Sequence, residues 1–172
     1  MQLWNTTERY GLVSKLLHWG IAALFFVQFV IGDLMDDDDP SQLGLHTSLG
    51  ILLALLVLIR IPVSKLQTQP VYPPHMGPWE CRLADLMKIA LNLGVLLVAA
   101  FGYLAITTKG EAPLFFGVAM PMLIGENEML HEFFKEGHEL LAWLLLMLVG
   151  VHVAAALKHH FIDGDDVLRR MR

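Results

Sequence analysis

Four histidines stand within or at the mouth of long apolar stretches of this sequence. They are His18, His46, His138 and His152, out of eight histidines in all. An ionisable side chain is costly in an apolar span, and such a residue is by default a candidate for a functional site. Imidazole binds metal ions and changes its charge near neutral pH, so metal ligation and proton transfer are the chemistries to consider.

Helix geometry relates two of these histidines. His138 and His152 are 14 residues apart, which at about 100° and 1.5 Å per residue puts both on one face of a helix, about 21 Å apart along its axis. One helix therefore offers a ligand at each of two levels. Depth along the apolar stretches matches His18 with His152, and His46 with His138.

Two imidazoles per site suit haem iron, because the porphyrin leaves two axial positions open. Zinc usually takes three or four protein ligands, and no such cluster stands at either level. The only cysteine is Cys81, and the absence of a C-x-x-C-H motif excludes covalent c-type haem. Gly50 lies one helical turn after His46, where a missing side chain would admit a porphyrin. The alternative is that these histidines pack helices or face the interface, which the two matched pairs disfavour.

The composition of the chain indicates that these histidines lie on membrane-spanning helices. The 172-residue chain is 55% hydrophobic and 17% charged, with a mean hydropathy of +0.54, whereas soluble domains carry about 25% charge. Uncharged runs cover residues 16–32, 40–59, 89–108 and 140–157, each near the ~20 residues that cross a bilayer. We predict an all-α integral membrane four-helix bundle, with helices at about 12–34, 41–61, 83–107 and 136–161, in a single domain of residues 1–172. A soluble enzyme and a nucleic-acid binder are excluded.

The distribution of lysine and arginine predicts the orientation. With both termini cytoplasmic, ten basic residues fall inside and two outside, as the positive-inside rule requires. The inner ones are Arg9, Lys15, Arg60, Lys65, Arg82, Lys88, Lys158, Arg169, Arg170 and Arg172, and the outer ones are Lys109 and Lys135. A cleaved signal peptide is the competing interpretation of the first run, but no small-residue cleavage site follows it.

The loops complete this topology. The first, Asp36–Asp39, is acidic and outside. The second, about 61–82, contains five prolines and is predicted to be an extended cytoplasmic connector. The third, about 109–136, is outside, with a short surface helix over Glu126–Lys135. His75 and His131 are assigned to solvated loops.

Several motifs together resemble the bacterial cytochrome b561 family. They occur in the family's order across nearly the whole chain: His18-Trp19, His46-Thr-Ser-Leu-Gly50, Phe116-Gly117-Val-Ala-Met-Pro121, His138-Glu139, and Gly150-Val-His152 followed by Ala-Ala-Ala-Leu-Lys158-His159-His160-Phe161. The resemblance implies a bacterial inner-membrane protein with two b haems, one ligated by His18 and His152 and the other by His46 and His138. It also implies electron exchange with ubiquinone, and one branch of the family oxidises superoxide.

Two features depart from the superoxide-oxidising branch. Where that branch has a histidine pair early in the third helix, this sequence has Asp85 and Lys88, which at i,i+3 can form an ion pair. Where the branch has arginine in its first outer loop, this chain has aspartates. The outer face holds 11 acids and 2 bases, a net −9, while the inner face holds 6 acids and 10 bases, a net +4, and together they give the formal charge of −5.

The candidates for quinone contact are Lys158, His159 and His160, which leave the fourth helix beside the His18 and His152 level. Histidine can supply the protons that quinone reduction consumes. The alternative is a basic flank that only anchors the helix end.

We therefore expect electron transfer through two haem b groups, between a periplasmic donor and the ubiquinone pool. The donor is either superoxide or a cationic periplasmic redox protein that docks on the acidic outer face. A haem sensor without catalysis is a third, weaker possibility.

Overall fold

Four long helices dominate the computed structural model, which describes residues 2–36 and 39–171. They are α1 (Leu12–Leu34), α2 (Pro40–Leu66), α3 (Pro78–Thr108) and α4 (Glu128–Phe161), followed by a one-turn α5 (Val167–Arg170). All four are long and apolar enough to cross a membrane. The predicted all-α membrane architecture is confirmed, with the addition of a small hairpin formed by β1 (Leu114–Phe115) and β2 (Val118–Ala119).

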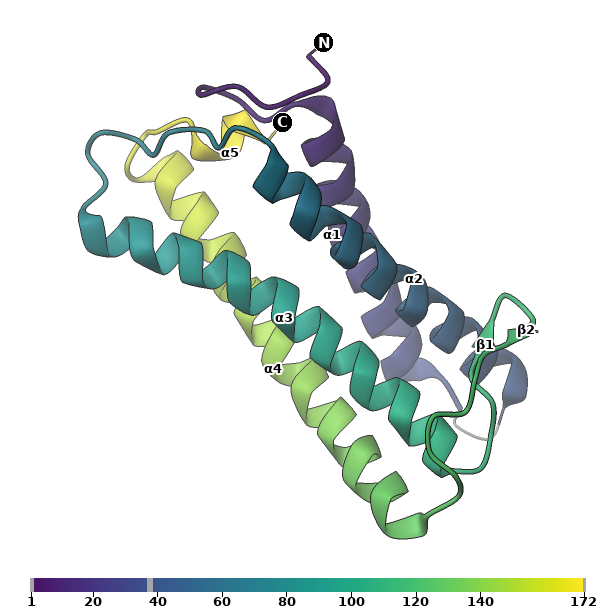
Figure 1. Ribbon diagram of the computed structural model, residues 1–172. Helices are drawn as coiled ribbons and strands as arrows, with labels where there is room; N and C mark the ends of the chain where they lie inside the picture. The colour runs from purple at the N-terminus through teal and green to yellow at the C-terminus, as the bar shows by residue number, and fades with distance from the viewer. Residues whose placement is uncertain (1, 37–38, 172) are drawn as a thin grey trace.

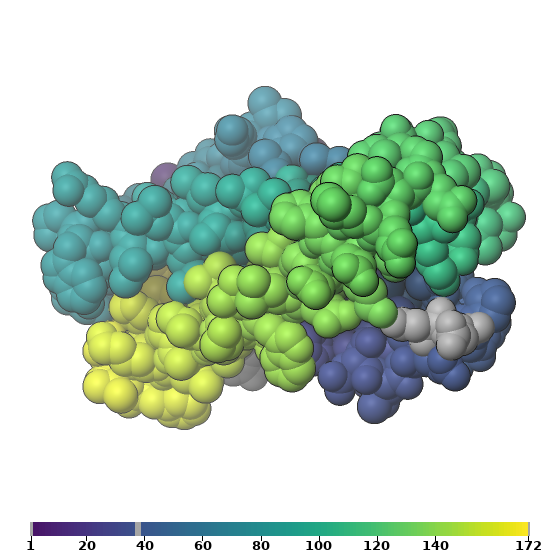
Figure 2. All heavy atoms as spheres, turned by 90° about the horizontal axis from the view of Figure 1, so that it is seen from below, coloured from purple at the N-terminus to yellow at the C-terminus, as the bar shows by residue number. Residues whose placement is uncertain are grey.

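The helices are arranged as two antiparallel pairs. α1 packs on α2, α3 packs on α4, and α2 also contacts α3. Both ends of the chain, the α2–α3 connector and α5 lie at one end of the bundle, which we call the termini end; the β hairpin lies at the other, the hairpin end (Figure 1). In Figure 2, which is seen from below, α4 runs from green to yellow across the molecule, with the teal α3 on one side of it and blue segments of α1 and α2 on the other.

The buried core is small and central. Its buried apolar side chains come from all four helices and include Ile21, Phe25, Val57, Val95 and Leu145. Many large apolar side chains point outward instead, among them Leu86, Leu140, Met147 and Val151. Such an exposed apolar surface would drive a soluble protein to associate, whereas in a bilayer it faces lipid.

The connector is shorter than the sequence predicted. α2 continues through Pro62 to Leu66, and α3 begins at Pro78, so the extended segment is 67–77 rather than 61–82. Pro78 occupies the first turn of α3, where its missing N–H removes a donor that has no partner anyway. Pro62 lies inside α2, and proline occurs within membrane helices more readily than its usual helix-breaking effect would suggest.

The third loop also differs from its prediction. α4 begins at Glu128 rather than near 136, so the separate surface helix over Glu126–Lys135 is wrong. Asn127 caps the helix by accepting a hydrogen bond from Leu130 N–H at 3.0 Å, as asparagine commonly does. His131 therefore belongs to α4 and not to a solvated loop.

The hairpin is a tight turn fastened to α2. Phe116 and Gly117 have φ of 48° and 87°, the two successive positive values that a two-residue hairpin loop of the primed type requires. The Ser48 hydroxyl accepts from Phe116 N–H at 2.9 Å and donates to Gly44 O at 2.6 Å. Ser48 thus holds the hairpin against the first turns of α2.

Candidate functional site

Two of the four histidines meet near the hairpin end. His46 on α2 and His138 on α4 have ring centroids 6.0 Å apart, with their planes at 84°. His138 Nδ1 lies 2.8 Å from the carbonyl oxygen of Val98 on α3. Because a carbonyl can only accept, Nδ1 carries the proton, and Nε2 keeps a lone pair that can bind a metal.

Gln28 on α1 contacts the other ring of this pair. Its Nε2 donates to the His46 carbonyl oxygen at 2.7 Å and lies 3.1 Å from His46 Nδ1. Gly50 lines the same region, but a Cβ there would lie 3.1 Å from Gln28 Nε2. The missing side chain of Gly50 therefore makes room for Gln28 directly beside His46.

Two glycines let these imidazoles approach neighbouring helices. A Cβ at Gly32 on α1 would lie 2.8 Å from His46 Cε1, and a Cβ at Gly102 on α3 would lie 2.8 Å from His138 Nδ1. Both distances are shorter than real contacts allow. Each ring is consequently packed against bare backbone, which restricts how it can turn.

A cavity of about 700 Å³ surrounds the His46 and His138 rings. This is within the range of small-molecule and cofactor sites. All four helices contribute to its wall, which includes Phe29, Gly50, Gly102, His131 and Trp143. The wall is mostly apolar, so it suits a flat hydrophobic group held by a few polar contacts.

The second pair lies toward the termini end. His18 on α1 and His152 on α4 have ring centroids 6.3 Å apart and planes at 77°. His18 Nδ1 is buried and finds no hydrogen-bond partner among the described residues. Gly20 and Gly150 are exposed and stand two residues from these histidines, about 200° around the helix, so the open space that a Cβ would meet there lies at the outer surface and not beside the rings.

The three candidate quinone residues, Lys158, His159 and His160, have different neighbours. Lys158 Nζ donates to Asp163 Oδ2 at 2.8 Å, and this hydrogen bond holds the pKa of the Asp163 carboxyl below its usual value. His159 Nδ1 lies 2.8 Å from Asp165 Oδ2. His160 Nδ1 is buried without a hydrogen-bond partner among the described residues. The sequence placed the three together, but in the described residues they differ: His159 Nδ1 is engaged by Asp165, whereas His160 has a buried, unsatisfied Nδ1.

The expected Asp85–Lys88 ion pair is confirmed, with Lys88 Nζ 2.8 Å from Asp85 Oδ1. Tyr72 of the connector joins it by donating its hydroxyl to Asp85 at 2.5 Å and accepting from Lys88 at 2.8 Å. Burial, together with the hydrogen bond to Asp85, raises the pKa of Tyr72. These contacts tie the connector to the first turns of α3.

In the acidic first loop, Asp37 and Asp38 lie outside the described residues. Asp39 caps α2 and accepts from the Ser41 hydroxyl at 2.7 Å, Ser41 N–H at 2.9 Å and Gln42 Nε2 at 2.9 Å. These bonds lower the pKa of Asp39 to about 2. Asp39 therefore stabilises the start of α2 in addition to contributing negative charge to the first loop.

Sequence reasoning missed three residues that shape the hairpin-end pair: Gln28, Gly32 and Gly102. Gln28 could have been found, because a polar side chain in the middle of an apolar span is itself a signal. The two glycines could not, since small residues in membrane helices are commonly ordinary packing positions. Their role depends on which helix faces which.

Residues 9–172 match the family model described as prokaryotic cytochrome b561. The chain belongs to the prokaryotic cytochrome b561 family. Cytochrome b561 homolog 2 of Escherichia coli is 33% identical, over 99% of this chain and 95% of its own length. The probable superoxide oxidase CybB of Yersinia pestis is 26% identical over 95% and 96%, and cytochrome b562 of Cereibacter sphaeroides is 26% identical over 94% of both chains.

Membership of the cytochrome b561 family confirms the resemblance seen in the sequence motifs. It makes this chain a multi-pass bacterial membrane protein that holds haem b and takes part in electron transfer.

Proposed function

We propose that this cytochrome carries electrons across the bacterial inner membrane through two b haems. His18 and His152 hold one haem, and His46 and His138 hold the other. The termini end faces the cytoplasm, in agreement with the positive-inside distribution. The observation that carries the proposal is the meeting of four histidines as two ring pairs, with one member of each pair on α4.

The ring separations support ligation of one metal by each pair. Metal–imidazole bonds are about 2.0–2.1 Å, and a ring nitrogen lies about 1.2 Å from its ring centre, so two rings that bind one ion would have centroids at most about 6.4–6.6 Å apart. The observed separations are 6.3 and 6.0 Å. The cavity around His46 and His138 also supports a bulky apolar group there.

Haem iron supplies a reversible one-electron change, and the chain's own residues fix where it happens. Val98 O holds the tautomer of His138 that leaves Nε2 available. The glycines at 32 and 102 bring α1 and α3 close to the rings, and the mostly apolar cavity wall suits an apolar group there. Because both ligand pairs share α4, the two sites are about 21 Å apart along that helix.

Haem quantification tests the proposal. The wild-type protein, expressed with adequate haem, should hold two haems per chain. His152→Ala should lose only the haem at the termini end, and His46→Ala only the one at the hairpin end, as resolved by redox titration of the absorption bands. His131→Ala, a histidine of the same cavity outside both ring pairs, serves as the control and should keep both. A wild-type content of one haem or none contradicts the proposal.

Ubiquinone is the proposed electron acceptor at the termini end. Its reduction takes up two electrons and two protons, and Lys158, His159 and His160 are the residues that we propose to meet it. Of these, His160 is the best proton donor, because its buried Nδ1 has no partner among the described residues. His159 Nδ1 is already engaged by Asp165.

Stopped-flow transfer from reduced haem to a soluble ubiquinone analogue tests this assignment. The His159→Ala/His160→Ala double variant should transfer more slowly at unchanged haem content, and His160→Ala alone should account for most of the loss. Unchanged transfer in the double variant would exclude this end of α4 as the quinone site.

Two electron donors remain, each with its own support. The relative named a probable superoxide oxidase supports superoxide, which would give up one electron and leave as O₂. The acidic outer face supports a cationic periplasmic redox protein, because a field of this sign attracts cations and changes association rates by ~10–10³-fold.

The salt dependence of haem reduction separates the two donors. Exposed charges are screened within about 8–10 Å at physiological ionic strength. Added salt should slow reduction by a cationic protein, and should speed up or leave unchanged reduction by superoxide. If superoxide reduces the haems near the diffusion limit and salt slows it, the outer mouth is locally positive and the preference for a cationic protein donor is wrong.

A further inference from the structure

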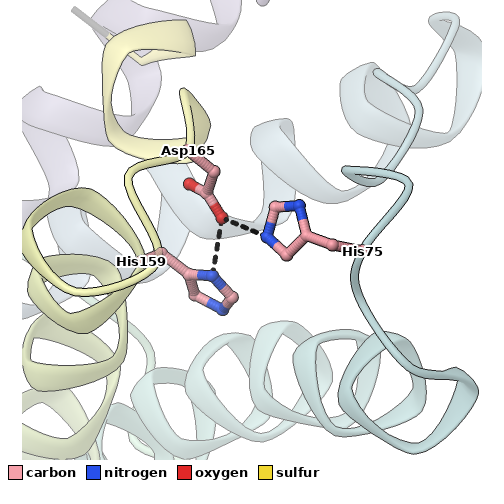
Figure 3. Close-up of side chains that lie close together, drawn as sticks. All are labelled: His75, His159 and Asp165. Atoms are coloured by element: carbon pink, nitrogen blue, oxygen red, sulfur yellow. Dashed lines mark hydrogen bonds and ion pairs between the residues drawn. The ribbon is translucent and has the colours of Figure 1, made fainter.

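Apart from the proposed haem ligands, two histidines and a carboxylate converge at the termini end of the bundle, and one of them, His159, is also a proposed quinone contact. Figure 3 shows His75 from the connector and His159 from the end of α4, both pointing at Asp165 in the following loop. Asp165 Oδ2 lies 2.8 Å from His159 Nδ1 and 3.3 Å from His75 Nε2. All three ligand atoms lie within 4.8 Å of one another.

We propose that this cluster binds one divalent transition-metal ion of the zinc class, through His75 Nε2, His159 Nδ1 and Asp165 Oδ2. In a tetrahedral site with bonds of about 2.0–2.1 Å, the ligand atoms stand about 3.3–3.4 Å from one another. The three donors already approach that spacing from separate segments of the chain. Small side-chain movements would open the His159–Asp165 contact enough to admit the ion.

The donor set selects the class of metal. Two imidazoles and one carboxylate suit zinc and its neighbours in the first transition row, whereas calcium and magnesium prefer oxygen ligands throughout. Asp163 Oδ2 lies 3.1 Å from His159 Nδ1, but it also accepts a hydrogen bond from Lys158 Nζ at 2.8 Å, so the site is assigned to the three donors alone.

The carboxylate is held in place before any ion arrives. The Asp165 side chain is only 4% exposed, and its Oδ1 accepts a hydrogen bond from Val167 N–H at 3.0 Å. This leaves Oδ2 aimed at the two histidines, in the way that outer contacts usually orient metal ligands. The His75 side chain is 49% exposed, so an ion can enter from the solvent side.

Equilibrium dialysis against Zn²⁺ followed by metal analysis tests the site, using tag-free, haem-loaded protein in detergent. The wild-type protein should bind one zinc ion per chain. His75→Ala and Asp165→Asn should each weaken binding by about tenfold or more, which is the scale of losses around metal sites. The readout is metal content, so it does not depend on the haem or quinone assignments.

Asp166→Asn is the matched control. It removes the same charge from the same loop, but Asp166 pairs with Arg170 and not with the cluster. It should bind zinc as the wild type does. An unchanged haem spectrum verifies the fold of every variant, and because His75 lies on the exposed connector, its replacement is the decisive variant if Asp165→Asn fails to fold. If the wild-type protein binds no more zinc than His75→Ala, the proposal is wrong.

Discussion

The two histidine pairs are built differently although both use α4. At the hairpin end, the protein orients the rings itself: Val98 O fixes His138, and Gln28 contacts His46. At the termini end, His18 Nδ1 has no such partner among the described residues. Outer contacts normally set the orientation of a ligating histidine, and an acceptor such as Val98 O also sets its tautomer. The comparison therefore indicates that the hairpin-end site is preorganised, whereas the His18 ring depends more on the bound group for its position.

The largest loss of haem is expected when a side chain is added at Gly102, where the backbone of α3 now lies against the His138 ring. Gly102→Ala puts a methyl group where His138 Nδ1 now lies, 2.8 Å from the new Cβ, and so displaces the ring from its Val98 contact. Haem content should fall from about two per chain toward one, with the termini-end haem retained. Haem analysis and redox titration of the purified protein measure this.

Gly20→Ala is the control for that change, since its Cβ would meet no described atom within 4 Å. It should retain the hairpin-end haem in full. If Gly102→Ala also keeps both haems, close packing against α3 is not what positions His138, and the contrast between the two pairs loses its basis.

A smaller effect on haem binding is expected when the contact between Gln28 and His46 is removed. Gln28→Leu removes the amide beside His46 Nδ1 while keeping a side chain of similar size. Loss of an outer contact to a metal-ligating histidine typically costs 10–100-fold in affinity, so the hairpin-end haem should dissociate roughly that much faster to a haem acceptor such as apomyoglobin.

Gln69→Leu, an equivalent change on the exposed connector, should dissociate at the wild-type rate. Equal acceleration of both haems in Gln28→Leu would contradict a local role at His46 and point to a general loosening of the bundle.

The smallest effect concerns the cap of α2, which begins the helix that carries His46. Asp39→Ala should lower the thermal midpoint modestly at pH 7. Hydrogen bonds depress the pKa of Asp39 from 3.8 in the unfolded chain to about 2, so its contribution is complete above pH 3.8 and is lost as the pH falls toward 2. Thermal melts of the two proteins should therefore converge only below about pH 3.8. A midpoint difference that already disappears at pH 5 would mean that the Asp39 charge is not what stabilises the cap.

The four helices and the meeting of the histidines were predictable, because span length and the 14-residue spacing on α4 depend only on local geometry. Helix ends were less predictable. In a sequence, both Pro62 and Pro78 indicate a break between helices. In the structure, Pro62 lies within α2, whereas Pro78 begins α3. The Phe116–Gly117 turn was hidden because a non-glycine residue occupies a positive φ.

The surroundings of the site were harder still. Contacts of Gly32, Gly102 and Asp165 arise between segments far apart in the chain, and no periodicity encodes them. His75 and His131 were both assigned to solvent from their place between spans. His75 does lie in an exposed loop, where it also contacts Asp165, whereas His131 lies within α4, 2.8 Å from the Ala105 carbonyl oxygen.

Helix α4 is continuous from one histidine pair to the other and sets the spacing between them. Because His138 and His152 lie on one helix, the number of residues between them fixes how the two histidines are spaced and turned relative to each other. One residue inserted between them would rotate His152 by about 100° relative to His138, swinging it away from His18 while the His46 contact stayed in place. The spacing of the two histidine levels along α4 is thus set by the residue count of a single helix, and both pairs could be kept only by insertions close to whole helical turns.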